Sequence, residues 1–461
     1  MGYFHGERRA APMNTQSPKP GFWPRAAVAA GTGILFMVVY HLTNAYAAVS
    51  ARTGQCYWEW ELSLPLVAWL IVPYWSIDLL FVIAPFLCVS REELFALGRR
   101  LTLAIIVAGV VFMAWPLTLG FDRQGEYGIF APLFAAIHGF DKPNNLFPSL
   151  HVAFAVILRW TYHRHLGRLG RWIFHVWFAL ITASTVLVGQ HHLIDVAGGL
   201  ALAVVCCALV PEGAVRTGRH CRDRRAIFLS SGFAAGALIC CIPIIIWGGW
   251  AWLGVWPGLV LLLLAYGHIS GDAGIWGKTA RGIGWSTRLL FAPYLMMLQA
   301  SRWWWWRRDR VAAVAVAPGV WLGRLPRRGE VERLGIHAVL DLTAEHQGPV
   351  LAPGVERLHF PLMDVCTPSA GALAEAAQML EELRQRGPVL VHCALGYGRS
   401  AAVVAAWLIR YGGVTSSTEA GERIRACRPL VHLRPAIYNQ LDQLLSRPCV
   451  RDTLVVHARP F

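Results

Sequence analysis

One short stretch of the sequence, residues 388–400, places a cysteine and an arginine at a spacing suited to phosphate chemistry. Five residues separate Cys393 from Arg399, between an apolar run at 389–391 and a helix-forming run that starts at Ser400. A strand, a loop of exposed backbone N–H groups and a helix N-terminus together bind anions. The same amides and the helix dipole favour the nucleophilic thiolate form of a cysteine. The guanidinium can bind two phosphoryl oxygens at once.

The pattern His-Cys-x5-Arg-Ser resembles the signature of the cysteine-dependent protein phosphatases, dual-specificity branch. The similarity extends over roughly residues 315–447, and the segment 360–364 resembles the part of the family that carries its general acid. The resemblance implies roles for four side chains: Cys393 as nucleophile, Arg399 as phosphate clamp, Ser400 as stabiliser of the leaving thiolate and Asp364 as proton donor. The implied phosphate-binding loop comprises Ala394, Leu395, Gly396, Tyr397 and Gly398. The alternative, an ordinary buried cysteine after a strand, is disfavoured by the other residues of the pattern.

A second group of polar residues lies in the hydrophobic half of the chain. Two patterns, Asn145-Leu-Phe-Pro-Ser-Leu-His151 and Gly189-Gln-His-His-Leu-Ile-Asp195, each begin an apolar run. His191 and Asp195 are four residues apart and share one helix face, so the carboxylate can orient the imidazole. Both runs begin at the same predicted membrane surface, which places His151 and His191 at similar depth. The alternative is that these are ordinary interfacial polar residues. His192 points about 100° away from His191 on a helix and is expected to be a packing or interfacial residue.

These two patterns resemble the type 2 phosphatidic acid phosphatase superfamily over about residues 60–212. The resemblance implies that His191 attacks phosphorus, Asp195 orients it and His151 protonates the leaving group. It also implies that Ser149 helps to hold the phosphate, and it implies no metal and no other cofactor.

The sequence departs from that superfamily at three places. Leu150 stands where glycine is usual, Thr185 stands where arginine is frequent, and the usual Lys-x6-Arg-Pro element is not recognisable. In these departures the sequence resembles the inositol-phosphorylceramide and sphingomyelin synthase branch, which transfers phospho-headgroups between lipids. A cation must still neutralise phosphate, and Arg123 and Lys142 of the 121–146 loop are the candidates.

Composition identifies a membrane protein. Hydrophobic residues make up 56% of the 461 residues, with 21 Trp and a mean hydropathy of +0.45. The net charge is +15, but the arginines fall between apolar runs, so anionic lipid and membrane topology explain them better than nucleic acid. The 11 cysteines show no metal-binding spacing and no disulfide framework.

Eight apolar runs are candidate membrane spans. They cover about residues 27–50, 64–89, 101–120, 147–162, 172–189, 191–211, 227–247 and 251–271. Arginine and histidine cluster in the connections after the second, fourth and sixth spans, which predicts that these connections and the N-terminal tail are cytoplasmic. Residues 286–310, rich in Trp and Arg, are expected to form an interfacial helix. A ninth span is the alternative, and it would place Cys393 outside.

The predicted fold is therefore an all-α polytopic membrane domain of about eight spans, followed by a cytosolic α/β domain with a small, mostly parallel sheet. The predicted parts are a cytoplasmic tail (1–25), the membrane domain (26–272), an interfacial linker (273–312), the phosphatase-like domain (313–447) and a tail (448–461). The protein is expected in the cell (inner) membrane, with its phosphatase domain cytoplasmic.

Two functions compete. The first is a bifunctional enzyme: Cys393 hydrolyses a phosphomonoester in the cytosol, and His191 handles a lipid phosphate or phosphodiester at the outer face. The second is an active cysteine phosphatase tethered by a catalytically decayed, lipid-binding membrane domain. A catalytically dead phosphate sensor is disfavoured by the intact Cys393, Arg399 and Asp364. The expected substrates are a phosphorylated lipid, a phosphoprotein or both, and membrane lipids are the expected partners.

Overall fold

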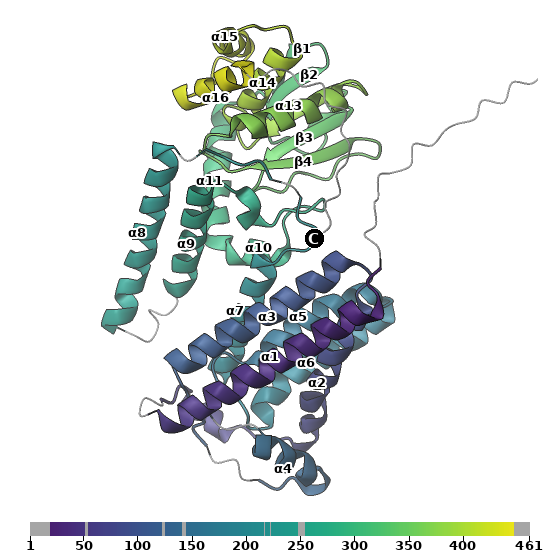
Figure 1. The fold of residues 1–461 in the computed structure, drawn as a ribbon, viewed down its shortest axis with the longest axis vertical. Helices are drawn as coiled ribbons and strands as arrows, with labels where there is room; N and C mark the ends of the chain where they lie inside the picture. Colours follow the sequence, from purple (N-terminus) through teal and green to yellow (C-terminus); the bar gives the residue numbers. More distant parts are fainter. Residues whose placement is uncertain are drawn as a thin grey trace, which may run out of the picture. The chain divides into compact units, whose positions relative to one another are not determined.

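The computed structural model describes residues 19–50, 54–121, 125–140, 144–215, 217–221, 223–247 and 254–446 (Figure 1). The chain divides into two compact units, residues 1–212 and residues 213–461. The predicted membrane domain, residues 26–272, therefore includes parts of both units. The predicted C-terminal tail, residues 448–461, and residues 1–18 of the N-terminal tail lie outside the described residues.

The first unit is a bundle of helices arranged around α5. Its helices are α1 (Phe22–Val49), η2 (Ala68–Leu70), α2 (Ile71–Leu87), α3 (Arg91–Ala114), α4 (Ala131–Phe140), α5 (Leu150–His165), α6 (Arg168–Leu187) and α7 (Leu193–Leu209), with short 3-10 turns η1 (Glu59–Ser63) and η3 (Gly128–Phe130). The helix α5 packs against α2, α3, α6 and α7. Its residues Ala153, Ile157 and Leu158 are fully buried, so this helix is the core of the unit.

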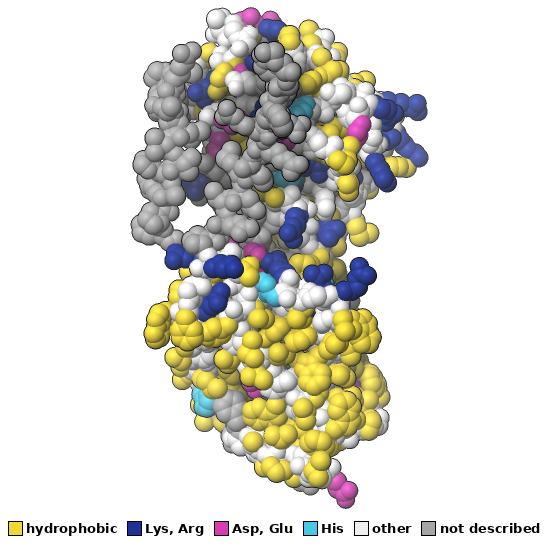
Figure 2. All heavy atoms as spheres, turned by 90° about the vertical axis from the view of Figure 1, so that its right-hand side faces the viewer, with side chains coloured by type: hydrophobic (Ala, Val, Ile, Leu, Met, Phe, Trp, Pro, Cys, Tyr) yellow, Lys and Arg dark blue, Asp and Glu magenta, His cyan; other side chains and the backbone are white. Residues whose placement is uncertain are grey.

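The outer surface of this bundle is apolar. Ile34, Leu79 and Val110 are each more than half exposed, and Figure 2 shows a broad hydrophobic face over these helices. Such a surface fits lipid rather than water. Within the described part of the chain, five helical segments are long and apolar enough to cross a membrane: Phe22–Val49, Ala68–Leu87, Arg91–Ala114, Arg168–Leu187 and Arg224–Pro243. The number of eight membrane spans stays a prediction.

The second unit begins with helices and ends with an α/β domain. The helices are α8 (Arg224–Trp247), α9 (Val255–Ser270), η5 (Ala273–Trp276), α10 (Trp285–Leu290) and α11 (Ala292–Arg308). The elements of the α/β domain are β1 (Ala313–Ala317), β2 (Val320–Arg324), α12 (Glu330–Arg333), β3 (Ala338–Thr343), β4 (Glu356–Leu362), α13 (Ala370–Arg384), β5 (Val389–Cys393), α14 (Arg399–Arg410), α15 (Ser417–Cys427) and α16 (Pro435–Ser446).

The sheet has the strand order β1-β2-β5-β3-β4, and β5 is its centre. Only the β1–β2 pair is antiparallel among its strand pairs, so the predicted mostly parallel sheet is confirmed. Successive residues of β5 point to opposite faces: Val389 and Val391 join the core with α13, α14 and α16, whereas Leu390 packs with Val339. Burial on both faces explains the continuous apolar run of this strand.

Candidate functional sites

The phosphate-type loop lies between the central strand β5 and the helix α14. Cys393 is the last residue of β5, and Arg399 is the first of α14. The backbone N–H of Gly396 donates to Cys393 Sγ at 3.2 Å, and Ser400 Oγ lies 3.3 Å from the same sulfur. Cys393 is only 4% exposed. An amide and a hydroxyl therefore both lie within hydrogen-bonding distance of the sulfur.

The two glycines of this loop are not equivalent. Gly396 has φ +80, and a Cβ there would meet the carbonyl carbon of Gly323 at 2.6 Å and the backbone nitrogen of Arg324 at 2.7 Å. Glycine is therefore required at position 396, where the loop turns against β2. At Gly398 a Cβ would meet nothing within 4 Å, so space does not demand glycine there.

A buried carboxylate holds the arginine of the loop. Arg399 Nη1 and Nη2 donate to the two oxygens of Glu345 at 2.9 and 2.7 Å, and Nη1 also donates to the Leu362 carbonyl at 2.8 Å. Burial alone would raise the pKa of Glu345, but the charge and hydrogen bonds of Arg399 lower it to about 2. Arg399 Nε is buried and has no partner among the described residues, which leaves it available to a phosphoryl oxygen.

Sequence reasoning missed Glu345. The residue follows β3, a neighbour of β5 in the sheet, so the C-terminal ends of two adjacent parallel strands meet at this edge. Side chains after adjacent parallel strands converge in this way in many α/β sites. An acidic residue two positions after the end of the apolar strand β3 was the available signal.

Asp364 lies over the loop on the chain that follows β4. Its Oδ1 is 3.1 Å from Arg399 Nη2, and its side chain is 47% exposed. The neighbouring Met363 and Cys366 are buried, so the carboxylate projects from an anchored segment. The structure thus brings together the four side chains for which the first family resemblance implied roles: Cys393, Arg399, Ser400 and Asp364.

The side chain of Tyr397 is engaged outside the loop. Its hydroxyl donates to Asp309, the C-cap of α11, and Arg428 Nη2 donates to the same carboxylate at 2.8 Å. Arg428 also lies 3.4 Å from the carbonyl oxygen of Leu395. Tyr397, one of the predicted phosphate-binding residues, can therefore bind phosphate through its backbone rather than its side chain. Its side chain connects the loop to the end of α11.

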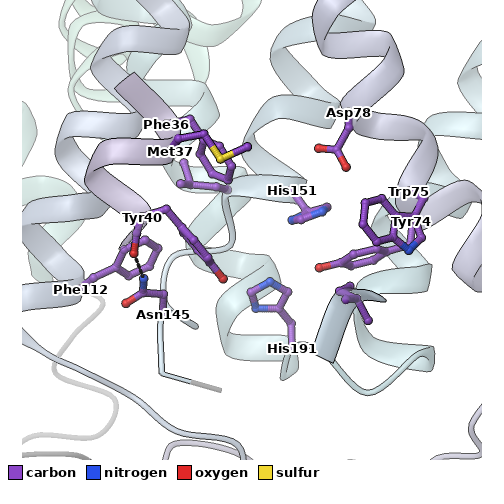
Figure 3. Close-up of a pocket in the computed structure, with 12 residues that line it drawn as sticks. Phe36, Met37, Tyr40, Tyr74, Trp75, Asp78, Phe112, Asn145, His151 and His191 are labelled. Carbon is purple, nitrogen blue, oxygen red and sulfur yellow. Dashed lines mark hydrogen bonds between the residues drawn. The ribbon is translucent and has the colours of Figure 1, made fainter. Parts of the chain in front are cut away.

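In the first unit, the two predicted histidines face a cavity of about 250 Å³. Figure 3 shows His151 and His191 beside Tyr40, Tyr74 and Asp78 around this space. The rings of His151 and His191 are 6.4 Å apart between centroids, and His151 stacks on Tyr74 at 4.2 Å. The fold therefore brings His151 and His191, which are far apart in the sequence, to the same cavity.

Asp195 contacts both chain segments that carry the two histidines. Its Oδ2 lies 3.4 Å from His191 Nδ1 and accepts the backbone N–H of His192 at 2.8 Å, which caps the start of α7. Its backbone carbonyl accepts the N–H of Ser149 at 3.0 Å. The hydroxyl of Ser149 caps α5, and this fully buried side chain does not line the cavity. His192 packs as predicted: it stacks on Tyr57 and accepts the N–H of Gly120.

The cations predicted for this site cannot be placed, because Arg123 and Lys142 lie outside the described residues. The described lining contains an acid instead, Asp78 of α2. Sequence reasoning missed Asp78, although an ionisable residue inside an apolar span is itself a functional signal.

Two family models match the chain: PAP2 superfamily over residues 62–209, and dual specificity phosphatase, catalytic domain, over residues 320–446. Dual specificity phosphatase 28 of Homo sapiens is 34% identical over 137 residues, which cover 28% of this chain and 76% of that protein. Phosphatidylglycerophosphatase and protein-tyrosine phosphatase 1 of Homo sapiens is 31% identical over 180 residues, which cover 36% of this chain and 89% of that protein.

Two solved structures match the second unit's part of the chain. Human DUSP28 aligns with a TM-score of 0.26 and 30% identity over 29% of this chain and 94% of that one. The active form of Tk-PTP aligns with a TM-score of 0.27 and 31% identity over 30% and 97%. Both family resemblances inferred from the motifs are confirmed by the sequence matches. The chain therefore belongs to the dual specificity phosphatases, which are phosphoric monoester hydrolases, and carries a PAP2-superfamily domain ahead of its phosphatase domain.

Proposed function

We propose that this protein is a membrane-bound phosphatase that removes phosphate from a lipid phosphomonoester at the cytoplasmic membrane surface. One observation carries the catalytic part: Cys393 Sγ accepts the amide of Gly396 beside the hydroxyl of Ser400, directly after the central strand. Arg399 and Asp364 form an ion pair at the same loop. This is a nucleophile, a phosphate clamp and an acid in one place.

The reaction proceeds in two displacements. The Cys393 thiolate attacks phosphorus and the bond to the leaving oxygen breaks, while protonated Asp364 donates its proton to that oxygen. Loop amides and Arg399 bind the other phosphoryl oxygens. Water then attacks the phosphocysteine, Asp364 accepts its proton, and the sulfur–phosphorus bond breaks. The Ser400 hydroxyl stabilises the departing thiolate, and inorganic phosphate leaves.

The helix α11 supports a lipid as the substrate. Trp303, Trp304 and Met296 of this helix are 53%, 44% and 72% exposed. Arg307 lies over the Trp303 ring at 3.6 Å, and Arg308 lies over the Trp304 ring at 3.7 Å. Exposed Trp with Arg suits the headgroup layer of a membrane. Since Asp309 at its end bonds to Tyr397, this helix would seat the phosphate loop at that layer.

A relative supports the same substrate class. The human relative that matches over 89% of its length is named as a phosphatidylglycerophosphatase as well as a protein-tyrosine phosphatase. A phosphomonoester on a lipid headgroup is therefore the first substrate to test, and a phosphotyrosine peptide is the second.

The test uses purified full-length protein in detergent, with His191→Ala present throughout so that the histidine cavity of the first unit does not contribute phosphate release. We expect phosphate release from phosphatidylglycerophosphate in mixed micelles to exceed that from a phosphotyrosine peptide, and Cys393→Ser to abolish both. A clear preference for the peptide would overturn the lipid assignment, while leaving the nucleophile assignment intact.

A second function is supported by the cavity of the first unit. His151 of α5, His191 in the segment directly before α7 and Asp195 of α7 lie close enough to serve as general acid, nucleophile and orienting carboxylate. We infer that this site cleaves or transfers a phosphate ester of a lipid at the outer face. The alternative, a decayed lipid-binding anchor, is favoured by the absence of Lys and Arg from the described lining of the cavity. Loss of lipid turnover in His191→Ala, with Cys393 already replaced by serine, distinguishes the two.

A further inference from the structure

The loop that carries Asp364, residues 361–369, is paired with the chain segment that leads into α8. That segment comprises residues 217–221 and Asp223, and it is called here the clamp. Three backbone hydrogen bonds, each 3.0 Å long, join the two: Gly218 N to Pro361 O, Cys221 N to Thr367 O, and Ser369 N to Arg219 O. His220 and Pro368 form an antiparallel bridge between them. The acid loop is thus held by the clamp at both of its ends.

The opposite edge of the clamp is bound to the end of α9. His220 N donates to Gly271 O at 2.8 Å, and Thr217 Oγ1 donates to Asp272 Oδ1 at 2.5 Å. Gly271 ends α9 in the left-handed region, with φ +67, and a Cβ there would meet His220 O at 2.7 Å. The clamp therefore lies between the acid loop and the helix pair α8–α9.

A single carboxylate connects the start of α8 to the acid loop. Asp223 Oδ1 accepts the backbone N–H of Ala226 in the first turn of α8, at 2.7 Å. Its Oδ2 accepts the hydroxyl of Thr367, also at 2.7 Å. Thr367 is fully buried, and Asp223 is partly buried. The Asp223 carboxylate therefore links the first turn of α8 to the acid loop.

The acid loop has a reason to need such support. Val365, the residue after Asp364, has φ +62, the only non-glycine residue with positive φ in the described ranges. A β-branched side chain rarely adopts this conformation, and it persists only where the surroundings enforce it. Met363 on the other side is buried, and a Cβ at Gly267 of α9 would meet its Cε at 2.8 Å. The clamp and α9 thus flank the strained turn that presents Asp364.

We propose that the clamp positions Asp364 for proton transfer, so that the ends of α8 and α9 form part of the phosphatase site, with Asp223 and Thr367 as positioning residues. This inference rests on the proposed role of Asp364 as general acid. The clamp lies outside residues 320–446, which the phosphatase family model matches. The clamp is therefore an addition to the catalytic domain, and it joins that domain to the apolar helix pair α8–α9.

The test compares two substrates that differ in their need for a proton. 4-Nitrophenyl phosphate has a good leaving group and needs little protonation, whereas phenyl phosphate has a poor one. In the full-length protein we expect Asp364→Asn to lower kcat on phenyl phosphate by about 100-fold or more, and much less on 4-nitrophenyl phosphate. Thr367→Val, which keeps the side-chain shape, and Asp223→Ala are expected to show the same selectivity at about 10-fold, with little change in KM.

Ser416→Ala is the matched control, because it removes a hydroxyl that caps α15 in the same unit, away from the acid loop. It is expected to change both substrates equally and slightly. The proposal is overturned if Thr367→Val affects the two substrates equally while Asp364→Asn separates them. If Asp364→Asn itself does not separate them, the general-acid assignment fails first, and the clamp proposal falls with it. Thr367→Val keeps the test decisive if Asp223→Ala does not fold.

Discussion

Glu345 and Arg399 form a buried bidentate pair directly behind the phosphate loop, with donor–acceptor distances of 2.7 and 2.9 Å. Both side chains are 3% exposed. The pair fixes the plane of the guanidinium and leaves its Nε for the substrate. The arginine is therefore pre-organised for phosphate before the substrate arrives.

Loss of the Glu345 charge should damage both binding and stability. We expect Glu345→Gln to raise KM by about 10-fold and to lower the free energy of unfolding by about 3 kcal/mol, because it leaves a buried guanidinium without its counter-charge. Glu356→Gln is the matched control, since the Glu356–Arg386 pair is exposed and should cost less than about 1 kcal/mol. Equal effects of the two substitutions, measured by steady-state kinetics and denaturant unfolding, would refute the positioning role.

Lys278 should anchor the linker after α9 to the sheet. Its Nζ donates to Asp341 Oδ2 at 2.8 Å and to the carbonyl oxygen of Thr343 at 2.5 Å, and it is buried. We expect Lys278→Met to lower the free energy of unfolding by about 3 kcal/mol. Arg281→Met, an exposed position on the same linker, should change it by less than about 0.5 kcal/mol. A small effect at Lys278 in thermal and denaturant unfolding would show that the linker is not integral to the domain.

Acid should destabilise the phosphatase unit in a defined window. Burial lowers the pKa of His392 to about 4, although the charge of Asp341 opposes this; Lys278 and Arg357 lower it further. Burial likewise lowers the pKa of His220 to about 4. Between pH 6.5 and 4 the unfolded chain therefore binds more protons than the folded one, so stability falls with falling pH.

Each of these histidines should contribute a slope of up to about 1.4 kcal/mol per pH unit within that window. Below it, Glu345, whose pKa is about 2, acts in the same direction as pH falls from its ordinary range. Denaturant unfolding at several pH values measures the slope. A His220→Gln variant that keeps the full slope would contradict the assignment of His220.

Substitution of any one of three residues that line the histidine cavity of the first unit should strongly lower its activity. In a Cys393→Ser background, His191→Ala, His151→Ala and Asp78→Asn should each lower lipid phosphate or phosphodiester turnover by about 100-fold or more. His41→Ala, an exposed position on α1, is the control and should leave turnover unchanged. Turnover that survives His191→Ala would favour the decayed anchor.

Local signals predicted the phosphate loop well. An apolar run, a glycine-bearing loop and a helix-forming run are contiguous, so Cys393, Arg399 and Ser400 were placed together without tertiary information. For the second site, His191 and Asp195 were expected on one helix face, but α7 begins at Leu193, so His191 lies in the segment before the helix. The two side chains still approach each other, with Asp195 Oδ2 3.4 Å from His191 Nδ1.

The remaining parts depend on contacts between distant segments. Glu345 lies 54 positions from Arg399, and Thr367 lies 144 positions from Asp223, so no local pattern relates them. The same reason explains why α8 and α9, predicted from hydropathy as part of the membrane domain, belong to the second compact unit. The hydropathy of a helix indicates whether its surface suits lipid or water, but it does not indicate which domain the helix packs against.

The covalent role of Cys393 is the central claim, and trapping the intermediate tests it most directly. Full-length protein carrying His191→Ala, which silences the second site, is mixed with a labelled phosphomonoester and quenched in acid within one turnover. It is then digested and examined by mass spectrometry for phosphate on the peptide that contains Cys393, and the variants below are made in the same His191→Ala background. Asp364→Asn, which lacks the group that activates water, should accumulate this species, and Cys393→Ser should show neither the label nor phosphate release. Phosphate release that persists in Cys393→Ser would contradict the account.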